Sequence, residues 1–187
     1  NRLVNEVDLP LNFEMAATKE MLNIASIFKP HAACIVPEKR EEITTEGGLD
    51  VVGQSDRLRE ICDELENIGS RVSLFIEADE AQIMAAAELG VPVIEIHAGA
   101  YSDSNPEDSF AELDKIKNGI KIATNIGLEC HVGHGLNYQN VEKIAEVREV
   151  AELNIGHFLI AEAVFSGLGN SVKRMRELID NARVQQE

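Results

Sequence analysis

The feature that most constrains this sequence is an alternation that repeats six times: a short apolar run typical of a β-strand, then a stretch with the apolar spacing of a helix. Strands that alternate with helices pair in parallel. Nearly continuous apolar strands indicate that both faces of the sheet are covered. The predicted strands are residues 9–16, 31–36, 71–76, 91–98, 128–132 and 153–160. The predicted helices lie around residues 18–28, 55–68, 79–90, 110–123, 141–145 and 171–182, with Ser55 and Ser171 as N-caps.

Two architectures fit this alternation, an open doubly wound sheet and a closed (β/α)8 barrel. Six strands in an open sheet would account for the length, but the glycine-rich dinucleotide fingerprint is absent after the first strand. The barrel better explains the polar residues at the strand ends. A full barrel takes about 250 residues, and the shortfall of this 187-residue chain matches roughly two strand–helix units. We therefore predict an α/β fold in which residues 1–187 form a single (β/α)8 barrel domain covering about units three to eight, with the first two units absent.

Charge and composition exclude several classes of function. Acidic residues number 33 against 17 basic ones, and no basic stripe typical of a nucleic-acid binder is present. No apolar run approaches the roughly 18–20 residues that span a bilayer, and no secretory leader is seen, so we expect a cytoplasmic protein with no membrane or nucleic-acid partner. The net charge of −16 opposes the approach of an anionic ligand, which would therefore need local donors.

The three cysteines, Cys34, Cys62 and Cys130, show no CxxC spacing and fall in apolar strand-like or helical positions. An odd number of such residues is typical of reduced, buried thiols rather than of a disulfide framework. We expect them to be structural, with a nucleophilic cysteine as the less favoured alternative.

Barrel active sites lie at the C-terminal ends of the strands, where this sequence places carboxylates and histidines. Glu14 ends the first predicted strand in apolar sequence, where a desolvated carboxylate suits a general base; a carboxylate paired with a buried Arg or Lys is the alternative. Glu95 and His97 are two residues apart and share a strand face. Both side chains reach the site if that face is the interior of the barrel. The alternative is that they hydrogen-bond each other and serve only to satisfy polar groups in the interior.

Histidines beside glycines follow the last two predicted strands. His134 is flanked by glycines, so a ligand can approach the backbone and the imidazole is exposed to act as a general acid. Gly135, Gly156 and His157 lie in the loops that often bind phosphate through backbone N–H groups in barrels. His131 lies within the strand and is expected to be a core histidine whose hydrogen bonds are satisfied.

The loop after the second predicted strand, residues 37–48, is long and polar. Thr44 and Thr45 offer hydroxyl donors to a phosphate, and the paired glycines at its end offer hinges for closure over a site. A solvated connection is the alternative interpretation.

Two other functions fit these residues. In a metal-dependent aldolase or epimerase on the same fold, the ligands would be Glu14, Glu95, His97 and His134. In a non-catalytic phosphosugar-binding barrel, the donors would bind phosphate without turnover.

Several strings in the sequence carry a specific resemblance to one known family. They are Asn12-Phe13-Glu14-Met15-Ala16, Val36-Pro37-Glu38-Lys39-Arg40, Thr44-Thr45-Glu46-Gly47-Gly48-Leu49-Asp50-Val51, Val72-Ser73-Leu74-Phe75-Ile76, Ile94-Glu95-Ile96-His97, Gly133-His134-Gly135-Leu136 and Glu152-Leu153-Asn154-Ile155-Gly156-His157. In this order they resemble the pyridoxine 5′-phosphate synthase family of vitamin B6 biosynthesis along almost the whole chain.

The resemblance implies a (β/α)8 barrel that condenses 1-deoxy-D-xylulose 5-phosphate with 3-amino-2-oxopropyl phosphate, releasing pyridoxine 5′-phosphate, phosphate and water. It implies a homo-octamer that uses no metal and no organic cofactor. By resemblance, Glu14 is the general acid/base, His134 the proton donor and Glu95 a carboxylate that stabilises a transition state. The resemblance also assigns Thr44 and Gly135 to the xylulose phosphate, and Gly156 and His157 to the amino-ketone phosphate.

The chain departs from the family pattern in two places. The family carries further site residues on its first two strands, including an Asn-x-Asp-His motif and another catalytic histidine, and these strands are not found in this sequence. Ala161 stands where relatives often have glycine.

Overall fold

The computed structural model describes residues 2–39, 42, 44, 47–105 and 107–184. Six strands alternate with helices in this part of the chain. The strands are β1 (Asn12–Ala16), β2 (Ala32–Val36), β3 (Arg71–Ile76), β4 (Val93–His97), β5 (Glu129–Gly133) and β6 (Val150–Asn154). The helices are α1 (Arg2–Glu6), α2 (Lys19–Phe28), α3 (Ser55–Asn67), α4 (Glu80–Glu88), α5 (Gly99–Asp103), α6 (Ser109–Asn125), α7 (Val141–Ala145), α8 (His157–Ser166) and α9 (Leu168–Val184).

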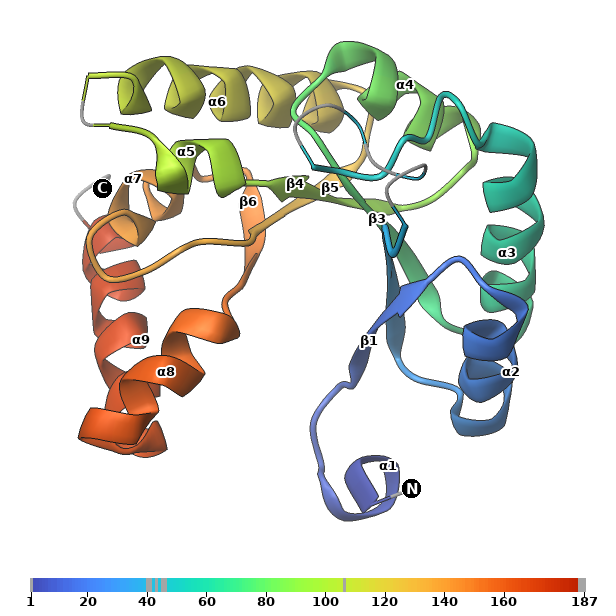
Figure 1. Ribbon diagram of the computed structural model, residues 1–187, viewed down its shortest axis with the longest axis horizontal. Helices are drawn as coiled ribbons and strands as arrows, with labels where there is room; N and C mark the ends of the chain where they lie inside the picture. The colour runs from blue at the N-terminus through green and yellow to red at the C-terminus, as the bar shows by residue number, and fades with distance from the viewer. Residues whose placement is uncertain (1, 40–41, 43, 45–46, 106, 185–187) are drawn as a thin grey trace.

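All six strands are parallel and follow one another across the sheet in sequence order, from β1 to β6. This confirms the parallel α/β fold. The strand order runs one way across the sheet, whereas in a doubly wound sheet the order reverses at the switch point. Figure 1 shows α2, α3, α4 and α6 along the outer side of the curved sheet, with β1 and β6 at its two ends.

The outer, convex face of the sheet forms the hydrophobic core with these helices. Alternate strand residues point outward and are almost completely buried, because each strand sends successive side chains to opposite faces. Helix residues spaced three and four apart cover them. The core includes Met15, Ala33, Ile35, Val72, Leu74, Ile76, Ile94, Ile96, Cys130 and Val132 from the strands and Leu58, Leu65, Ile83, Ile116, Ile120 and Ala123 from the helices.

The inner, concave face is polar, and its contacts show how strongly the sheet curls. Glu95 of β4 hydrogen-bonds both Cys34 of β2 and Asn154 of β6. Neighbouring strands lie about 4.8 Å apart, so in a flat sheet side chains two strands apart would not meet. Layers built from alternate strands are the interior packing of a (β/α)8 barrel. The sheet is thus a strongly curled parallel sheet, consistent with part of such a barrel.

The structure corrects three predicted boundaries. The last predicted strand, 153–160, is wrong over most of its length, because β6 ends at Asn154 and α8 begins at His157. Ser171 is not an N-cap: it is buried inside α9, where its hydroxyl donates to the Leu159 carbonyl. The N-cap of α3 is Gln54, one residue before Ser55. Both serines were misplaced because a Ser before an apolar stripe can also occupy the first turn itself.

The three cysteines are free and buried, which confirms them as reduced thiols. Burial is the main cause that raises the pKa of the Cys62 and Cys130 thiols to about 12, so neither forms a thiolate near neutral pH. No helix in the described ranges is both long and apolar enough to cross a membrane.

Candidate active site

Glu95 lies at the centre of the concave face and is only 3% exposed. Its Oε2 accepts hydrogen bonds from Asn154 Nδ2 at 2.7 Å and from the Cys34 thiol at 3.6 Å. Burial raises the pKa of Glu95 to about 7, and the nearby charge of Glu14 adds to the increase, although the Asn154 bond opposes it. A carboxyl group with this pKa can both donate and accept a proton near neutral pH.

Glu95 fits only because residue 133 is a glycine. Gly133 lies opposite His97 on the neighbouring strand, directly beneath the Glu95 carboxylate. A Cβ built at position 133 would lie 2.0 Å from Glu95 Oε1 and 3.1 Å from the backbone oxygen of Asn154. The gap left by this glycine lets Glu95 of β4 reach across β5 to Asn154 of β6.

Glu14 lies on the same concave face, on β1, but it is exposed rather than desolvated as predicted. The reason is its place: β1 has one neighbouring strand among the described residues, so nothing there covers this end of the face. Its charge nevertheless reaches the other groups. It contributes to raising the pKa of Cys34 and of Glu95, and it counteracts the lowering of the pKa of His134. The charge of Glu14 therefore acts on the Glu95 carboxyl group of the same face.

His134 follows β5 in a left-handed backbone conformation, with φ of 73°, and its side chain is exposed as predicted. One side of the ring faces His97, at 4.8 Å between centroids, and Phe75, at 6.2 Å. Partial desolvation and the neighbouring His97 lower the pKa of His134. The imidazole is consequently neutral at neutral pH in the absence of an anionic ligand.

His97 does not bond Glu95, which overturns the alternative of a mutual hydrogen bond. Its Nδ1 lies 2.7 Å from Oε1 of Glu77, a residue that directly follows β3. The same oxygen accepts the backbone N–H of Gly48 at 2.7 Å. Both side chains of the pair are about nine-tenths buried. His97 therefore belongs to a buried polar group that reaches from the sheet to the loop after β2.

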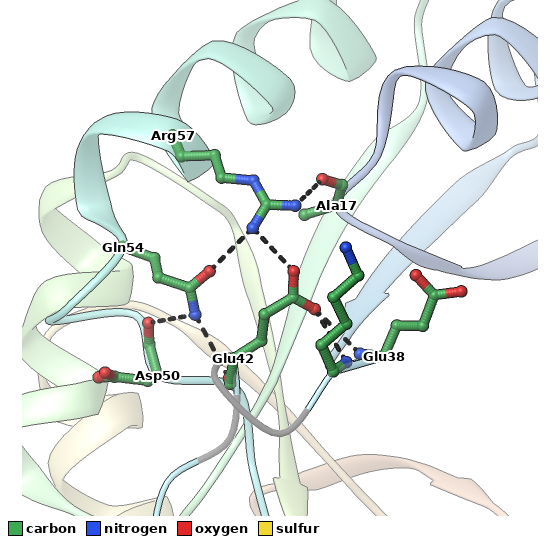
Figure 2. Close-up of polar contacts among 7 residues, drawn as sticks. Ala17, Glu38, Glu42, Asp50, Gln54 and Arg57 are labelled. Carbon is green, nitrogen blue, oxygen red and sulfur yellow. Dashed lines mark hydrogen bonds and ion pairs between the residues drawn. The ribbon is translucent and has the colours of Figure 1, made fainter.

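The loop after β2 is not a solvated connection, because buried contacts hold it on both sides of Thr44. Figure 2 shows Glu42 bonded to the guanidinium of Arg57, which also donates to the carbonyl of Ala17. Burial disfavours the Glu42 carboxylate, but the Arg57 bond and the backbone N–H groups of Glu38 and Lys39 outweigh it and lower its pKa. Thr44 itself donates its backbone N–H to the Gly48 carbonyl.

Thr44 lines a cavity of about 390 Å³ beside His97, bounded by α4, α5 and α6. Its hydroxyl oxygen is buried and has no hydrogen-bond partner among the described residues. A free, buried hydroxyl is a ready donor for a ligand oxygen. The neighbouring candidate Thr45 lies outside the described residues.

The remaining predicted phosphate binders lie at the same end of the sheet. Gly135 has a φ of 79°, and a Cβ there would lie 2.6 Å from the Ser102 side chain, so only glycine fits without displacement. Gly156 and His157 form the N-cap and first residue of α8, a position where unpaired N–H groups favour an anion. Both are exposed, and His157 is close enough to lower the pKa of His134.

His131 is a buried strand histidine, as predicted, but only Nε2 is hydrogen-bonded, and the buried Nδ1 has no hydrogen-bond partner among the described residues. It is buried toward the N-terminal end of β5, with Nε2 2.9 Å from Glu129 and Nδ1 3.6 Å from Glu152. Glu129 also pairs with Arg71 at 2.7 Å. These groups form an ion-paired cluster that lies away from the loop that carries His134.

Sequence reasoning missed Glu77, Cys34 and Asn154 as parts of the site. A signal existed for Glu77, a carboxylate at the C-terminal end of the third strand, the position used to select Glu14. No spacing rule links Cys34, Glu95 and Asn154, which meet only because the sheet curls. Among the described residues, no three His, Cys, Asp or Glu side chains are grouped to hold a metal ion.

Comparison with known proteins identifies the family. The family model described as pyridoxal phosphate biosynthesis protein PdxJ matches residues 1–181. The pyridoxine 5′-phosphate synthase of Zymomonas mobilis subsp. mobilis is 58% identical over 179 residues, covering 96% of this chain and 70% of that protein. The protein of the same name from Rhodospirillum rubrum is 56% identical over 185 residues, covering 97% of this chain and 73% of that protein.

Solved structures of low sequence identity share the fold. KGPDC from Streptococcus mutans superposes with a TM-score of 0.64 at 12% identity, covering 97% of this chain and 76% of that chain. A chain of the Amycolatopsis orientalis BexX/CysO complex gives a TM-score of 0.63 at 19% identity, covering 98% and 72%. The family model and the sequence relatives lead to one assignment: the chain belongs to the PdxJ family of pyridoxal phosphate biosynthesis proteins.

Proposed function

We propose that the site on the concave face catalyses the pyridoxine 5′-phosphate synthase reaction by acid/base chemistry. The family assignment makes the chain an enzyme of vitamin B6 biosynthesis. The substrates follow from the family: 1-deoxy-D-xylulose 5-phosphate and 3-amino-2-oxopropyl phosphate. The observation that supports the mechanism is the placement of Glu14 and Glu95 on one face, where the charge of Glu14 adds to the raised pKa of Glu95 and opposes the lowering of the pKa of His134.

The chemistry requires repeated proton transfer. Imine formation, dehydration, loss of phosphate and ring closure each move a proton between carbon, nitrogen and oxygen. Glu95, with a pKa of about 7, is the group best suited to hold a proton in the resting site and release it in a later step. Glu14, exposed on the open side of the face, is the group free to meet a substrate proton first.

His134 is proposed as the proton donor, and its lowered pKa sets a condition on that role. A neutral imidazole must take up a proton before it can donate one. Two phosphorylated substrates bring negative charge beside the ring, which favours the imidazolium form and raises the pKa of His134. The histidine would therefore become an acid when the site is loaded.

The phosphate groups need local donors because the chain carries a net charge of −16. We assign the xylulose phosphate to Thr44 and Gly135, and the amino-ketone phosphate to Gly156 and His157. The buried, unpartnered Thr44 hydroxyl and the N-terminus of α8 support this assignment. Holding both substrates at once makes their reaction effectively intramolecular, which contributes up to about 7–11 kcal/mol in ideal cases.

Substitution of Glu14 by Gln tests the catalytic proposal. The amide keeps the size of the side chain but cannot move a proton. We expect the formation of pyridoxine 5′-phosphate to fall by at least about 100-fold while calorimetry still detects binding of 1-deoxy-D-xylulose 5-phosphate. Unchanged turnover would refute the role of Glu14. Binding without turnover in the unmodified protein would instead favour the phosphosugar-binding barrel.

We further propose that β1 to β6 are the third to eighth strands of an eight-stranded barrel that assembles into a homo-octamer. β1 and β6 each have one neighbour, and α8 is apolar although none of its residues is buried. Ile160, Val164 and Phe165 of α8 are 61–88% exposed, as expected of a surface that another segment or subunit covers. Intact mass of the natural polypeptide tests the barrel: a mass of only 20.5 kDa would contradict it. Native mass spectrometry tests the octamer.

A further inference from the structure

We propose that Glu77 is a positioning residue: it orients His97 beside His134 and ties the Thr44 segment to the same point. The inference rests on the proposed function and extends it to residues that the family resemblance did not assign. It follows from one shared atom. Oε1 of Glu77 accepts both the Gly48 N–H and a hydrogen bond with His97 Nδ1, each at 2.7 Å.

The bond to Glu77 selects the tautomer of His97. A backbone N–H can only donate, so Glu77 Oε1 acts as an acceptor toward Gly48, and an ionised carboxylate can accept a second donor on the same oxygen. His97 Nδ1 then carries the hydrogen, and Nε2 is left as an acceptor. A carboxylate that sets the tautomer of a histidine in this way determines what the opposite ring nitrogen can do.

The His97 ring is closely surrounded, and only glycine fits beside it at positions 47 and 99. A Cβ at position 99 would lie 2.5 Å from His97 Nε2, and a Cβ at position 47 would lie 3.0 Å from Cε1. Phe75 packs edge-on against the ring at 5.0 Å between centroids. The remaining side faces His134 at 4.8 Å. A change in the orientation of His97 would therefore be passed directly to the proposed proton donor.

The same carboxylate fixes the Thr44 segment. Thr44 donates its backbone N–H to the Gly48 carbonyl, and Gly48 donates its own N–H to Glu77. Three hydrogen bonds thus connect the backbone of Thr44, which carries the proposed phosphate-binding hydroxyl, to His97. Glu42 provides the internal comparison. It is also buried and holds the loop from the other side of Thr44, but its bonds lead to Arg57 and α3, away from any histidine.

The experiment compares Glu77→Ala with Glu42→Ala by steady-state kinetics. Both changes remove a buried acceptor that holds backbone N–H groups of the same loop, so both should raise the KM for 1-deoxy-D-xylulose 5-phosphate. Only Glu77→Ala should also lower kcat, by about 10- to 100-fold, because only Glu77 orients His97. Glu77→Gln keeps an acceptor oxygen at the same place and should recover most of the lost kcat. Equal effects of the two alanine variants on kcat, or no recovery by Gln, would overturn the proposal.

A second measurement needs no variant and no turnover. Nitrogen-15 NMR of the neutral form of the His97 imidazole in the unmodified protein should show hydrogen on Nδ1 and none on Nε2. The opposite tautomer, or an equal mixture, would contradict the inference even if the enzyme is active. Conversely, absence of pyridoxine 5′-phosphate formation by the unmodified protein would refute the proposed function while the NMR result still decides whether Glu77 orients His97.

Discussion

The two ends of the concave face contain the same kinds of residue, but the pKa of a carboxyl group is lowered at one end and raised at the other. At the N-terminal ends of the strands, Arg71, Glu129, His131 and Glu152 pair with one another. The Arg71 and His131 bonds lower the pKa of Glu129 to about 2, so this carboxylate stays ionised. At the C-terminal ends, burial raises the pKa of Glu95 to about 7, and its hydrogen-bond partners are a neutral amide and a thiol.

The difference shows how one face of a curled sheet separates stability from chemistry. Where a carboxylate is paired with Arg or His, it stays ionised and the pair serves as structure. Where an acid is buried without a cation, its proton is easily exchanged near neutral pH, and the group can do acid/base work at a cost in stability. The following predictions test whether that division is real.

Glu95→Gln should produce the largest effects, in opposite directions. The raised pKa means that folding favours the protonated form of Glu95, so its contribution to stability is present below pH 4.5 and is lost as the pH rises through about 7. Gln is neutral at every pH and its oxygen can still accept from Asn154 and Cys34. At pH 8.5 the variant should be more stable by up to about 3 kcal/mol, and turnover should fall by at least about 100-fold.

Urea unfolding at pH 5 and pH 8.5, with turnover measured on the same samples, checks this prediction. The gain in stability should be small at pH 5, where Glu95 is protonated in the folded protein. A variant that loses stability at pH 8.5 would show that the Glu95 carboxylate is held as an ion, as Glu129 is.

Gly133→Ala tests whether the C-terminal end of the concave face differs from the N-terminal end through the placement of Glu95 and not through its chemistry alone. The added methyl would lie 2.0 Å from Glu95 Oε1, so the carboxylate must leave Asn154 or the strand must shift. We expect a loss of about 1–3 kcal/mol in unfolding free energy together with a loss of turnover. Gly169→Ala is the matched control, because a Cβ there meets nothing within 4 Å and alanine favours the helix. Equal behaviour of the two variants would remove the steric argument.

The fold could be predicted from the sequence wherever the spacing of apolar residues followed a single period, either that of a strand or that of a helix. Alternating faces and helical spacing placed five of the six strands, because burial of the convex face imposes a pattern that does not depend on distant residues. The sixth failed because residues 153–160 form one apolar stretch that contains the end of β6 and the start of α8. Gly156 marks the break, and the sequence interpretation assigned that glycine only to ligand approach.

The site could be predicted only in part. Strand ends identified Glu14, Glu95, His97 and His134, because in a parallel sheet all these ends meet at one edge. Which group bonds which partner could not be predicted. The bond from Glu95 to Asn154 spans two strands, and the bond from His97 to Glu77 joins the ends of adjacent strands. The first bond depends on the curl of the sheet and the second on the pairing register of β3 and β4, and no local pattern records either.

Glu129→Gln should have the smallest effect and completes the comparison. The carboxylate is 37% exposed, so solvent screens its pairing and the loss at pH 7 should be no more than about 1 kcal/mol. Its lowered pKa means that the contribution is present above pH 4.5 and disappears as the pH falls through about 2, so variant and parent should converge in acid. Turnover should not change, although the substitution weakens a carboxylate–histidine bond just as Glu77→Ala does. Loss of turnover would mean that the paired groups at the N-terminal ends of the strands set the shape of the site at the C-terminal ends. The separation of stability from chemistry would then fail.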